Sequence, residues 1–223
     1  MSFSGGTMRN VIGICGLIGS GKGTVADHLV KNDYKKISFA DKLKDGVSTI
    51  FSWDRAMLEG DTKESRAWRE QPDAFWTKEL GKDITPRLVL QLFGTDCMRN
   101  GFDDSIWVNL VKKEILENPD QNYVIPDVRF PNEIDVVKNL GGQVWQVRRG
   151  NLPDWWATAI NVNQNWETRS ENHSMKVIFP EVHQSEWRWV DDDDKFDRII
   201  ENNDTLDKLI EHITSVISQK DPS

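Results

Sequence analysis

The sequence is poor in cysteine and in basic residues, and it has no long apolar run. Two cysteines in 223 residues cannot build a disulfide framework, which favours a reducing compartment such as the cytoplasm. Lys and Arg number 28 against 36 Asp and Glu, for a net charge of −8, so we expect no nucleic-acid-binding surface. No apolar stretch reaches the length of a membrane span. These features predict a cytoplasmic globular protein of one domain, residues 1–223, without nucleic acid or membrane partners.

A glycine-rich segment follows the first apolar run. Val11–Cys15 predicts a buried strand, residues 16–22 read Gly-Leu-Ile-Gly-Ser-Gly-Lys, and residues 25–30 predict a helix. Strand, glycine-rich loop and helix in this order are the context of a phosphate-binding P-loop. The alternative is a glycine turn without a ligand, which the lysine and its spacing disfavour. We therefore expect an ATP site with Lys22 at the β- and γ-phosphates, formed by Gly16, Gly19, Ser20, Gly21, Lys22, Gly23 and Thr24.

The residue after the P-loop lysine departs from the general motif. That motif has Ser or Thr directly after the lysine to bind Mg²⁺, whereas here Gly23 intervenes before Thr24. The Gly-Lys-Gly-Thr form resembles adenylate-kinase-type loops. It argues against direct Mg²⁺ ligation by Thr24, which could still contact a phosphate or a metal-bound water.

The ends of the later predicted strands carry further candidates. Residues 121–127 predict a central strand that ends in Asp127, a carboxylate placed to hold Mg²⁺ directly or through water. Arg129 follows two residues later and could contribute to a cationic clamp. Residues 143–149 predict another strand, and Arg149 at its end could contact ATP or simply lie exposed.

A second group of candidates lies in predicted helices. Residues 34–39 predict a strand that leads into a helix over 40–51, and ligands of open α/β sheets bind at such junctions, so Lys44 is either a phosphate contact or a surface lysine. Thr85 and Pro86 predict a helix start. Arg87 and Gln91 share one face of that helix, where Arg87 could bind a phosphate and Gln91 a base edge.

Two regions are less regular. Residues 52–81 are polar and charged with interspersed tryptophans, and they predict a helical insert on the substrate side, in which Lys63 contacts substrate or lies on a solvated face. Residues 151–190 predict no defined element and are expected to form a variable loop or lid. Residues 105–116 predict a helix with Trp107 near its start, and the residues alone favour a core anchor for this tryptophan.

Several segments together resemble one family, the deoxynucleoside monophosphate kinases of tailed bacteriophages. The segments are the P-loop and residues 39–45, 86–99, 106–108, 125–129 and 199–209. They span most of the chain, and Arg-x-x-x-Gln-x-x-Gly-Thr-Asp within 86–99 is far more specific than the P-loop. The short run His183-Gln-Ser-Glu186 also resembles a family motif, although its role does not follow from the residues.

The resemblance implies an α/β fold, with a P-loop NTPase-type parallel sheet flanked by helices. It implies transfer of the γ-phosphate of ATP to a deoxynucleoside monophosphate with Mg²⁺, in the host cytoplasm if a phage encodes the protein, and it is compatible with a homodimer. Lys22, Arg87 and Arg129 would be catalytic, and Trp107 would stack on a base. The residues expected to bind the acceptor are Leu43, Lys44, Lys63, Arg87, Gln91, Gly94, Thr95, Arg99, Trp107, Asp127 and Arg129.

Three alternatives remain at this stage. The first is another P-loop small-molecule kinase, acting on phosphomevalonate or dephospho-CoA, and Gln91 and Trp107 argue against it because they suit a nucleobase. The second is a nucleotide-binding switch protein, which the clustered arginines disfavour. The third is a DNA-dependent ATPase, which the acidic composition disfavours.

Overall fold

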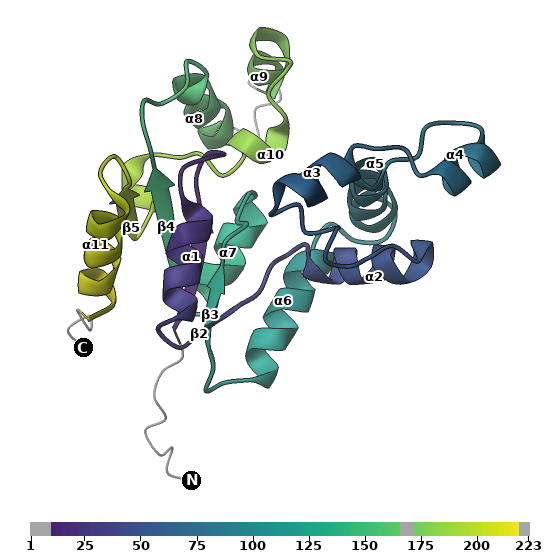
Figure 1. The fold of residues 1–223 in the computed structure, drawn as a ribbon. Coiled ribbons are helices and arrows are strands. Elements are labelled where there is room, and N and C mark those ends of the chain that lie inside the picture. Colours follow the sequence, from purple (N-terminus) through teal and green to yellow (C-terminus); the bar gives the residue numbers. More distant parts are fainter. Residues whose placement is uncertain (1–9, 166–171, 219–223) are drawn as a thin grey trace. The chain divides into compact units, whose positions relative to one another are not determined.

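The chain forms two compact units (Figure 1). The computed structural model describes residues 10–165 and 172–218. The first unit, the sheet unit, comprises the residues before Phe39 and from Ile115 onward, and the second, the helical unit, comprises Phe39–Glu114. Within the described ranges, no helix is long and apolar enough to cross a membrane.

The sheet unit contains five parallel strands in the order β2-β3-β1-β4-β5. Every residue of the central strand β1 is buried, as expected for a parallel sheet covered on both faces. The predicted α/β fold class is therefore confirmed. The strands are β1 (Val11–Cys15), β2 (Tyr34–Lys36), β3 (Asn122–Ile125), β4 (Gln143–Arg148) and β5 (Arg198–Glu201).

Two predicted strand ends were wrong. The strand expected to end in Asp127 ends at Ile125, because Pro126 has no N–H to continue the ladder, and Asp127 lies in the following turn. The strand expected over 34–39 ends at Lys36, although the N–H of Ile37 still donates to the Val124 carbonyl at 3.0 Å.

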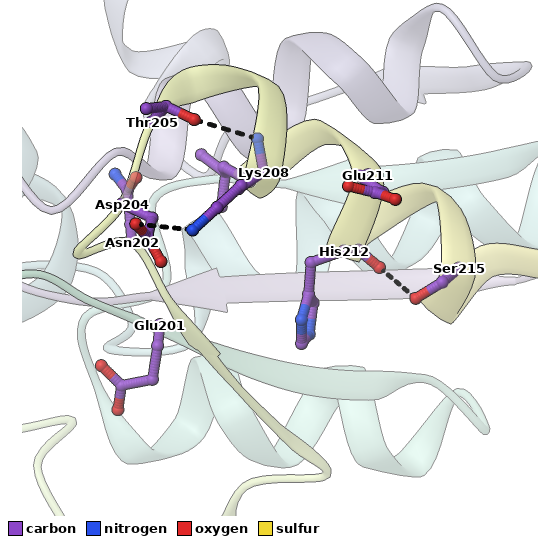
Figure 2. Close-up of a pocket in the computed structure, with 9 residues that line it drawn as sticks. Glu201, Asn202, Asp204, Thr205, Lys208, Glu211, His212 and Ser215 are labelled. Carbon is purple, nitrogen blue, oxygen red and sulfur yellow. Dashed lines mark hydrogen bonds and ion pairs between the residues drawn. The ribbon is translucent and has the colours of Figure 1, made fainter.

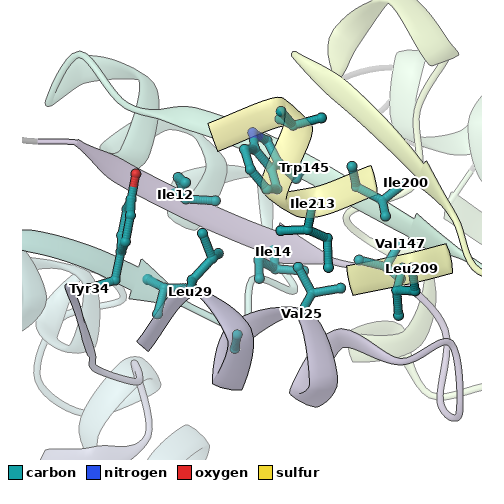
Figure 3. Packing of buried hydrophobic residues seen from close by; sticks show 13 residues of the cluster. Ile12, Ile14, Val25, Leu29, Tyr34, Trp145, Val147, Ile200, Leu209 and Ile213 are labelled. Atoms are coloured by element: carbon teal, nitrogen blue, oxygen red, sulfur yellow. The ribbon is translucent and has the colours of Figure 1, made fainter. Parts of the chain in front are cut away.

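Helices cover both faces of this sheet. Ile12 and Ile14 point from β1 toward the helices α1 and α11, as Figure 3 shows for the buried cluster. On the opposite face a Cβ at Gly13 would meet Val137 of α7 at 3.0 Å. Each fully buried aliphatic side chain of this kind stabilises the fold by about 1.5–3 kcal/mol. The helices of the unit are α1 (Lys22–Val30), α7 (Pro131–Asn139), α8 (Trp156–Gln164), α9 (Asn172–Ile178), α10 (Gln184–Trp187) and α11 (Leu206–Ser218), with a 3-10 turn at Asp193–Lys195.

The region 151–190 is more regular than the sequence suggested. It contains α8, α9 and α10, although residues 166–171 lie outside the described part of the chain. Buried tryptophans provide the apolar contacts: Trp156 and Trp189 meet edge to face at 5.5 Å between ring centroids. The amide of Asn163 in α8 donates to the carbonyls of Trp187 and Val190 at 2.8 and 2.7 Å, which fastens α10 to α8.

The helical unit is built around a second core of Val47, Trp53, Leu58, Ile84 and Val89. Its short helices begin with side-chain caps, as at Thr85, whose hydroxyl accepts from Leu88 N at 3.1 Å. Two of the helices, α3 and α4, lie in residues 52–81, where a helical insert was predicted. The elements are α2 (Asp41–Phe51), α3 (Lys63–Arg69), α4 (Ala74–Leu80), α5 (Pro86–Gln91), a π-helical segment (Leu92–Asn100) and α6 (Ile106–Glu117), within which the boundary between the units falls.

Candidate active site

The glycine-rich loop joins β1 to α1 in a conformation that its glycines make possible. Gly16 has φ +149°, and a Cβ there would lie 2.4 Å from the Val147 carbonyl oxygen of β4. Gly21 has φ +102°, and a Cβ there would lie 2.4 Å from the Asn202 amide nitrogen. These positive φ angles and close approaches exclude larger residues. The loop therefore presents backbone groups beside the N-terminus of α1, as the P-loop prediction requires.

Lys22 is the first residue of α1 and folds back over the loop. Its Nζ donates to the carbonyls of Gly16 and Leu17 at 2.6 and 2.8 Å. Burial and the nearby Arg129 guanidinium lower the pKa of Lys22 to about 8, and the Glu186 carboxylate partly opposes this shift. The sheet unit thus brings together two of the three predicted catalytic cations.

Arg129 is held by a carboxylate at each end of the residue. Its backbone N–H donates to Oε2 of Glu133 at 2.7 Å, and Glu133 is buried in the first turn of α7. Its Nη1 donates to Oε1 of Glu186 at 3.0 Å and approaches Ser185 Oγ at 3.5 Å. The short motif at 183–186 therefore contacts Arg129 through Ser185 and Glu186, a position that the sequence did not reveal.

The remaining predicted residues of the sheet unit lie at strand ends or in α1. The hydroxyl of Ser38, after β2, donates to Oδ2 of Asp127, after β3, at 2.5 Å. Arg149 is exposed directly after β4, and Thr24 is exposed in the first turn of α1. Among the described residues there is no group of three or more His, Cys, Asp or Glu that could hold a metal ion.

In the helical unit, Lys44 belongs to a cluster of charged side chains. Its Nζ lies 2.6 Å from Oε2 of Glu59, and its side chain is only 12% exposed, so it is not a freely solvated surface lysine. Arg55 contacts the same Glu59 and also Asp45, at 2.7 Å. Contact with both cations lowers the pKa of Glu59 below its usual range, although its own burial opposes this effect.

Two other cations expected to bind the acceptor, Arg87 and Arg99, are also paired. Arg87 in α5 contacts Glu70 at 2.9 Å, and both side chains are exposed. Arg99 lies 3.7 Å from Asp104 and is 14% exposed. Gln91, at the end of α5, and Lys63, at the start of α3, are exposed.

Leu43, Gly94 and Trp107 meet inside the helical unit. A Cβ at Gly94 would lie 2.8 Å from Leu43 Cδ2, so a larger residue at this position of the π-helical segment would displace the end of the Leu43 side chain. Trp107 Nε1 donates to the Gly94 carbonyl at 3.0 Å, and the side chain is 6% exposed. This is the placement of a core anchor, the alternative that the residues alone favoured. Base stacking by Trp107 stays a prediction, as does a contact by the half-buried Thr95.

Asn202 is a further residue that the sequence did not single out. It follows β5, and its side-chain amide donates to the Ser20 carbonyl of the loop at 2.8 Å. Asn202 also lines a cavity of about 540 Å³ along α11 (Figure 2). The nine residues around that cavity include none of the predicted ATP- or acceptor-binding residues, so we do not assign the cavity to the active site.

Comparisons with known proteins agree with the resemblance inferred from the sequence. Residues 67–158 match the family described as deoxynucleotide monophosphate kinase. A putative deoxynucleotide monophosphate kinase of Acanthamoeba polyphaga mimivirus is 34% identical over 155 residues, which cover 64% of this chain and 75% of that protein. The deoxynucleoside-5′-monophosphate kinase of Escherichia phage T5 is 38% identical over 55 residues, 25% of this chain and 22% of that protein.

Among solved structures, the dephospho-CoA kinase from Campylobacter jejuni aligns with a TM-score of 0.39 at 17% identity, over 96% of this chain and 98% of that chain. The mimivirus relative, at its identity and coverage, decides the family. The chain belongs to the deoxynucleotide monophosphate kinase family.

Proposed function

We propose that this protein transfers the γ-phosphate of ATP to a deoxynucleoside 5′-monophosphate, giving a deoxynucleoside diphosphate and ADP. The observation that carries the proposal is the pair of cations in the sheet unit, Lys22 on the glycine-rich loop and Arg129 near enough to lower its pKa. Such a pair suits the charge of a transferring phosphoryl group. The family selects the acceptor, since the viral relatives are named as kinases of deoxynucleoside monophosphates.

In this reaction the loop binds ATP. Backbone N–H groups of the loop and the N-terminus of α1 would bind the β- and γ-phosphates. Lys22 Nζ, which now donates to two loop carbonyls, would donate to phosphate oxygens when ATP is bound. Arg129 would stabilise charge on the transferred group. The acceptor phosphate is already ionised, so no strong general base is required.

Asp127 is the carboxylate that would hold Mg²⁺, with water molecules completing the ligand set. The donor set fits this ion, because Mg²⁺ binds oxygen and in kinase sites usually keeps several waters beside one or two carboxylates and the substrate phosphates. The oxygens of Asp127 and Ser38 lie together after neighbouring strands. Bound Mg²⁺ would neutralise negative charge on the β- and γ-phosphates.

The helical unit would supply the acceptor contacts. Lys44, Arg87 and Arg99 are the cations proposed to bind the monophosphate, and each now contacts a carboxylate, so the phosphate would compete with Glu59, Glu70 and Asp104. Gln91 would read the base edge. Leu43, Gly94 and Trp107 would fix the backbone around this part of the site, with Thr95 and Lys63 as further contacts.

The proposed setting follows from the viral relatives. The enzyme would supply DNA precursors in the cytoplasm of an infected cell, with ATP and the monophosphate as its partners. The acidic composition argues against a nucleic-acid partner. A homodimer stays a prediction, which light scattering of the purified protein would test.

The decisive experiment is ADP release from Mg-ATP with each common deoxynucleoside and ribonucleoside monophosphate in turn. We expect release with one or more deoxynucleoside monophosphates, and release about a thousandfold slower from Lys22→Ala. Tight ATP binding without release for any nucleotide would overturn the proposal. Phosphomevalonate and dephospho-CoA would then be tested as acceptors.

A further inference from the structure

The helix α10 presents a carboxylate to the guanidinium of Arg129. Glu186 lies 57 residues after Arg129 in the chain, and its Oε1 accepts from Arg129 Nη1 at 3.0 Å. At the start of the same helix, His183 Nδ1 accepts from the N–H of Ser185 at 3.3 Å and lies 2.9 Å from the Ser185 hydroxyl. The motif at 183–186 is thus a local cap followed by the carboxylate that meets Arg129.

We propose that Glu186 is a positioning residue, which directs the Arg129 guanidinium at the nucleotide-binding loop and acts on phosphoryl transfer only through Arg129. The inference rests on the proposed function. It adds a residue from the region 151–190 that neither the sequence nor the family comparison assigned to the site.

The end of α10, which carries Glu186, is fixed to α8 by hydrogen bonds. Trp187, the next residue, is 2% exposed, and its carbonyl accepts from the Asn163 amide at 2.8 Å. Arg188 Nη1 donates to Asn163 Oδ1 at 3.0 Å. A carboxylate on such a support can fix a partner side chain, whereas a carboxylate on an unsupported loop would move with it.

Arg129 is a side chain that benefits from a second point of attachment. Its backbone is fixed by Glu133 through the N–H, but the several rotatable bonds of an arginine leave the guanidinium free to adopt many directions. The ion pair with Glu186 restricts those directions. The negative charge of Glu186 also offsets the repulsion between Arg129 and Lys22, which lie close enough for Arg129 to lower the lysine pKa.

The exposure of the pair argues against a purely structural role. The Arg129 side chain is 43% exposed and that of Glu186 is 25% exposed. Ion pairs open to solvent contribute little to folding stability, so Glu186→Gln should leave the fold intact. Its effect should appear in the reaction.

The first test compares Glu186→Gln with Glu181→Gln, which removes the same charge from an exposed position five residues earlier. We expect kcat with Mg-ATP and the best deoxynucleoside monophosphate to fall roughly tenfold in Glu186→Gln. This lies between the roughly fivefold effect of an exposed ion pair and the roughly hundredfold effect of a misplaced catalytic group. Glu181→Gln should match the wild type, and both variants should melt as the wild type does. Unchanged kcat in Glu186→Gln would overturn the proposal.

The second test is a double-mutant cycle of Glu186→Gln and Arg129→Ala. If Glu186 acts only through Arg129, then adding Glu186→Gln to Arg129→Ala costs no further activity. Losses that multiply in the double variant would refute the positioning role. A wild type without kinase activity would instead refute the proposed function. The same cycle measured as the Kd for ATP would then decide the role of Glu186, with non-additive losses supporting it and additive losses or none refuting it.

Discussion

The P-loop lysine of the sheet unit and the acceptor-binding cations of the helical unit are held in different ways. In the sheet unit, Lys22 is bonded to backbone carbonyls of its own loop, five and six residues away in the chain. In the helical unit, Lys44 and Arg87 are bonded to the side chains of Glu59 and Glu70, 15 and 17 residues away. We call the Lys22 site the backbone-built site, because it depends on glycines and on the start of a helix. We call the site of Lys44 and Arg87 the side-chain-built site, because it depends on charges that another anion can displace.

The largest effect should come from the lysine of the backbone-built site. Lys22→Ala should lower kcat by about a thousandfold, because a preorganised donor to the transferred charge is lost. Its melting temperature should stay close to that of the wild type. Lys31→Ala, at an exposed position just after α1, is the matched control and should keep full activity. Steady-state kinetics with Mg-ATP checks both variants, and a Lys22→Ala enzyme with normal turnover would contradict the assignment.

Substitutions of the loop glycines test whether the site depends on the backbone conformation of the loop. Gly16→Ala should destabilise the fold by about 2 kcal/mol, because its φ suits glycine and its new methyl would meet the Val147 carbonyl. Gly23→Ala is the control, since a Cβ there meets nothing within 4 Å and alanine favours helix. Urea unfolding measures both. Equal stability of Gly16→Ala and wild type would show that the loop is not held as described.

The lowered pKa of Lys22 predicts that the affinity for ATP depends on pH. The protonated amine binds phosphate, so ATP affinity should be full below the pKa of about 8 and should weaken as the pH rises through it. One unit above that pKa only about a tenth of the lysine is protonated, so the Kd for ATP should rise by up to roughly tenfold. Titration calorimetry at several pH values checks this. Lys22→Arg stays charged and should show no such slope, and an equal slope in both proteins would argue against Lys22 as the titrating group.

The smallest effect should come from a carboxylate of the side-chain-built site. Glu59→Gln removes the charge that Lys44 and Arg55 share, and it should lower the free energy of unfolding by about 1 kcal/mol. The KM for the monophosphate should change while the KM for ATP stays the same. Glu79→Gln, exposed in α4, controls for the loss of one charge. A change in the KM for ATP would contradict the proposal that Glu59 affects only the binding of the monophosphate.

The sequence predicted the backbone-built site better than the side-chain-built one, for a physical reason. Gly16, Gly21 and Lys22 act through neighbouring residues, so their spacing alone carries the motif. Cations held by side chains are harder to predict in either unit. The partner of Arg129, in the sheet unit, lies 57 residues away, and neither spacing nor residue type reveals such a pair. Likewise, the burial of Lys44 follows from the tertiary packing of the helical unit. The local sequence cannot reveal this burial, because it would look the same for a solvated lysine and for a lysine that binds phosphate.

Local patterns also limited the prediction of the fold. Continuous apolar runs identified β1 and most of the sheet, but Pro126 ended β3 two residues before the predicted end. The sequence of residues 151–190 predicts no defined element, because the apolar contacts of this region come from a few tryptophans rather than from a regular stripe. Trp187 and Trp189 are each 2% exposed, and a scattered aromatic of this kind does not produce a helical period.

The hydrogen bond from Asn202 to the Ser20 carbonyl has a consequence for how the protein is made. The two residues are 182 positions apart, so the nucleotide loop near the start of the chain gains this support only after β5 has been synthesised and paired with β4. A nascent chain that ends before residue 202 carries the complete glycine motif but lacks the amide that supports it. Nucleotide binding should therefore be a late event during translation, and ATP should protect the finished protein from proteolysis much more than it protects such a fragment.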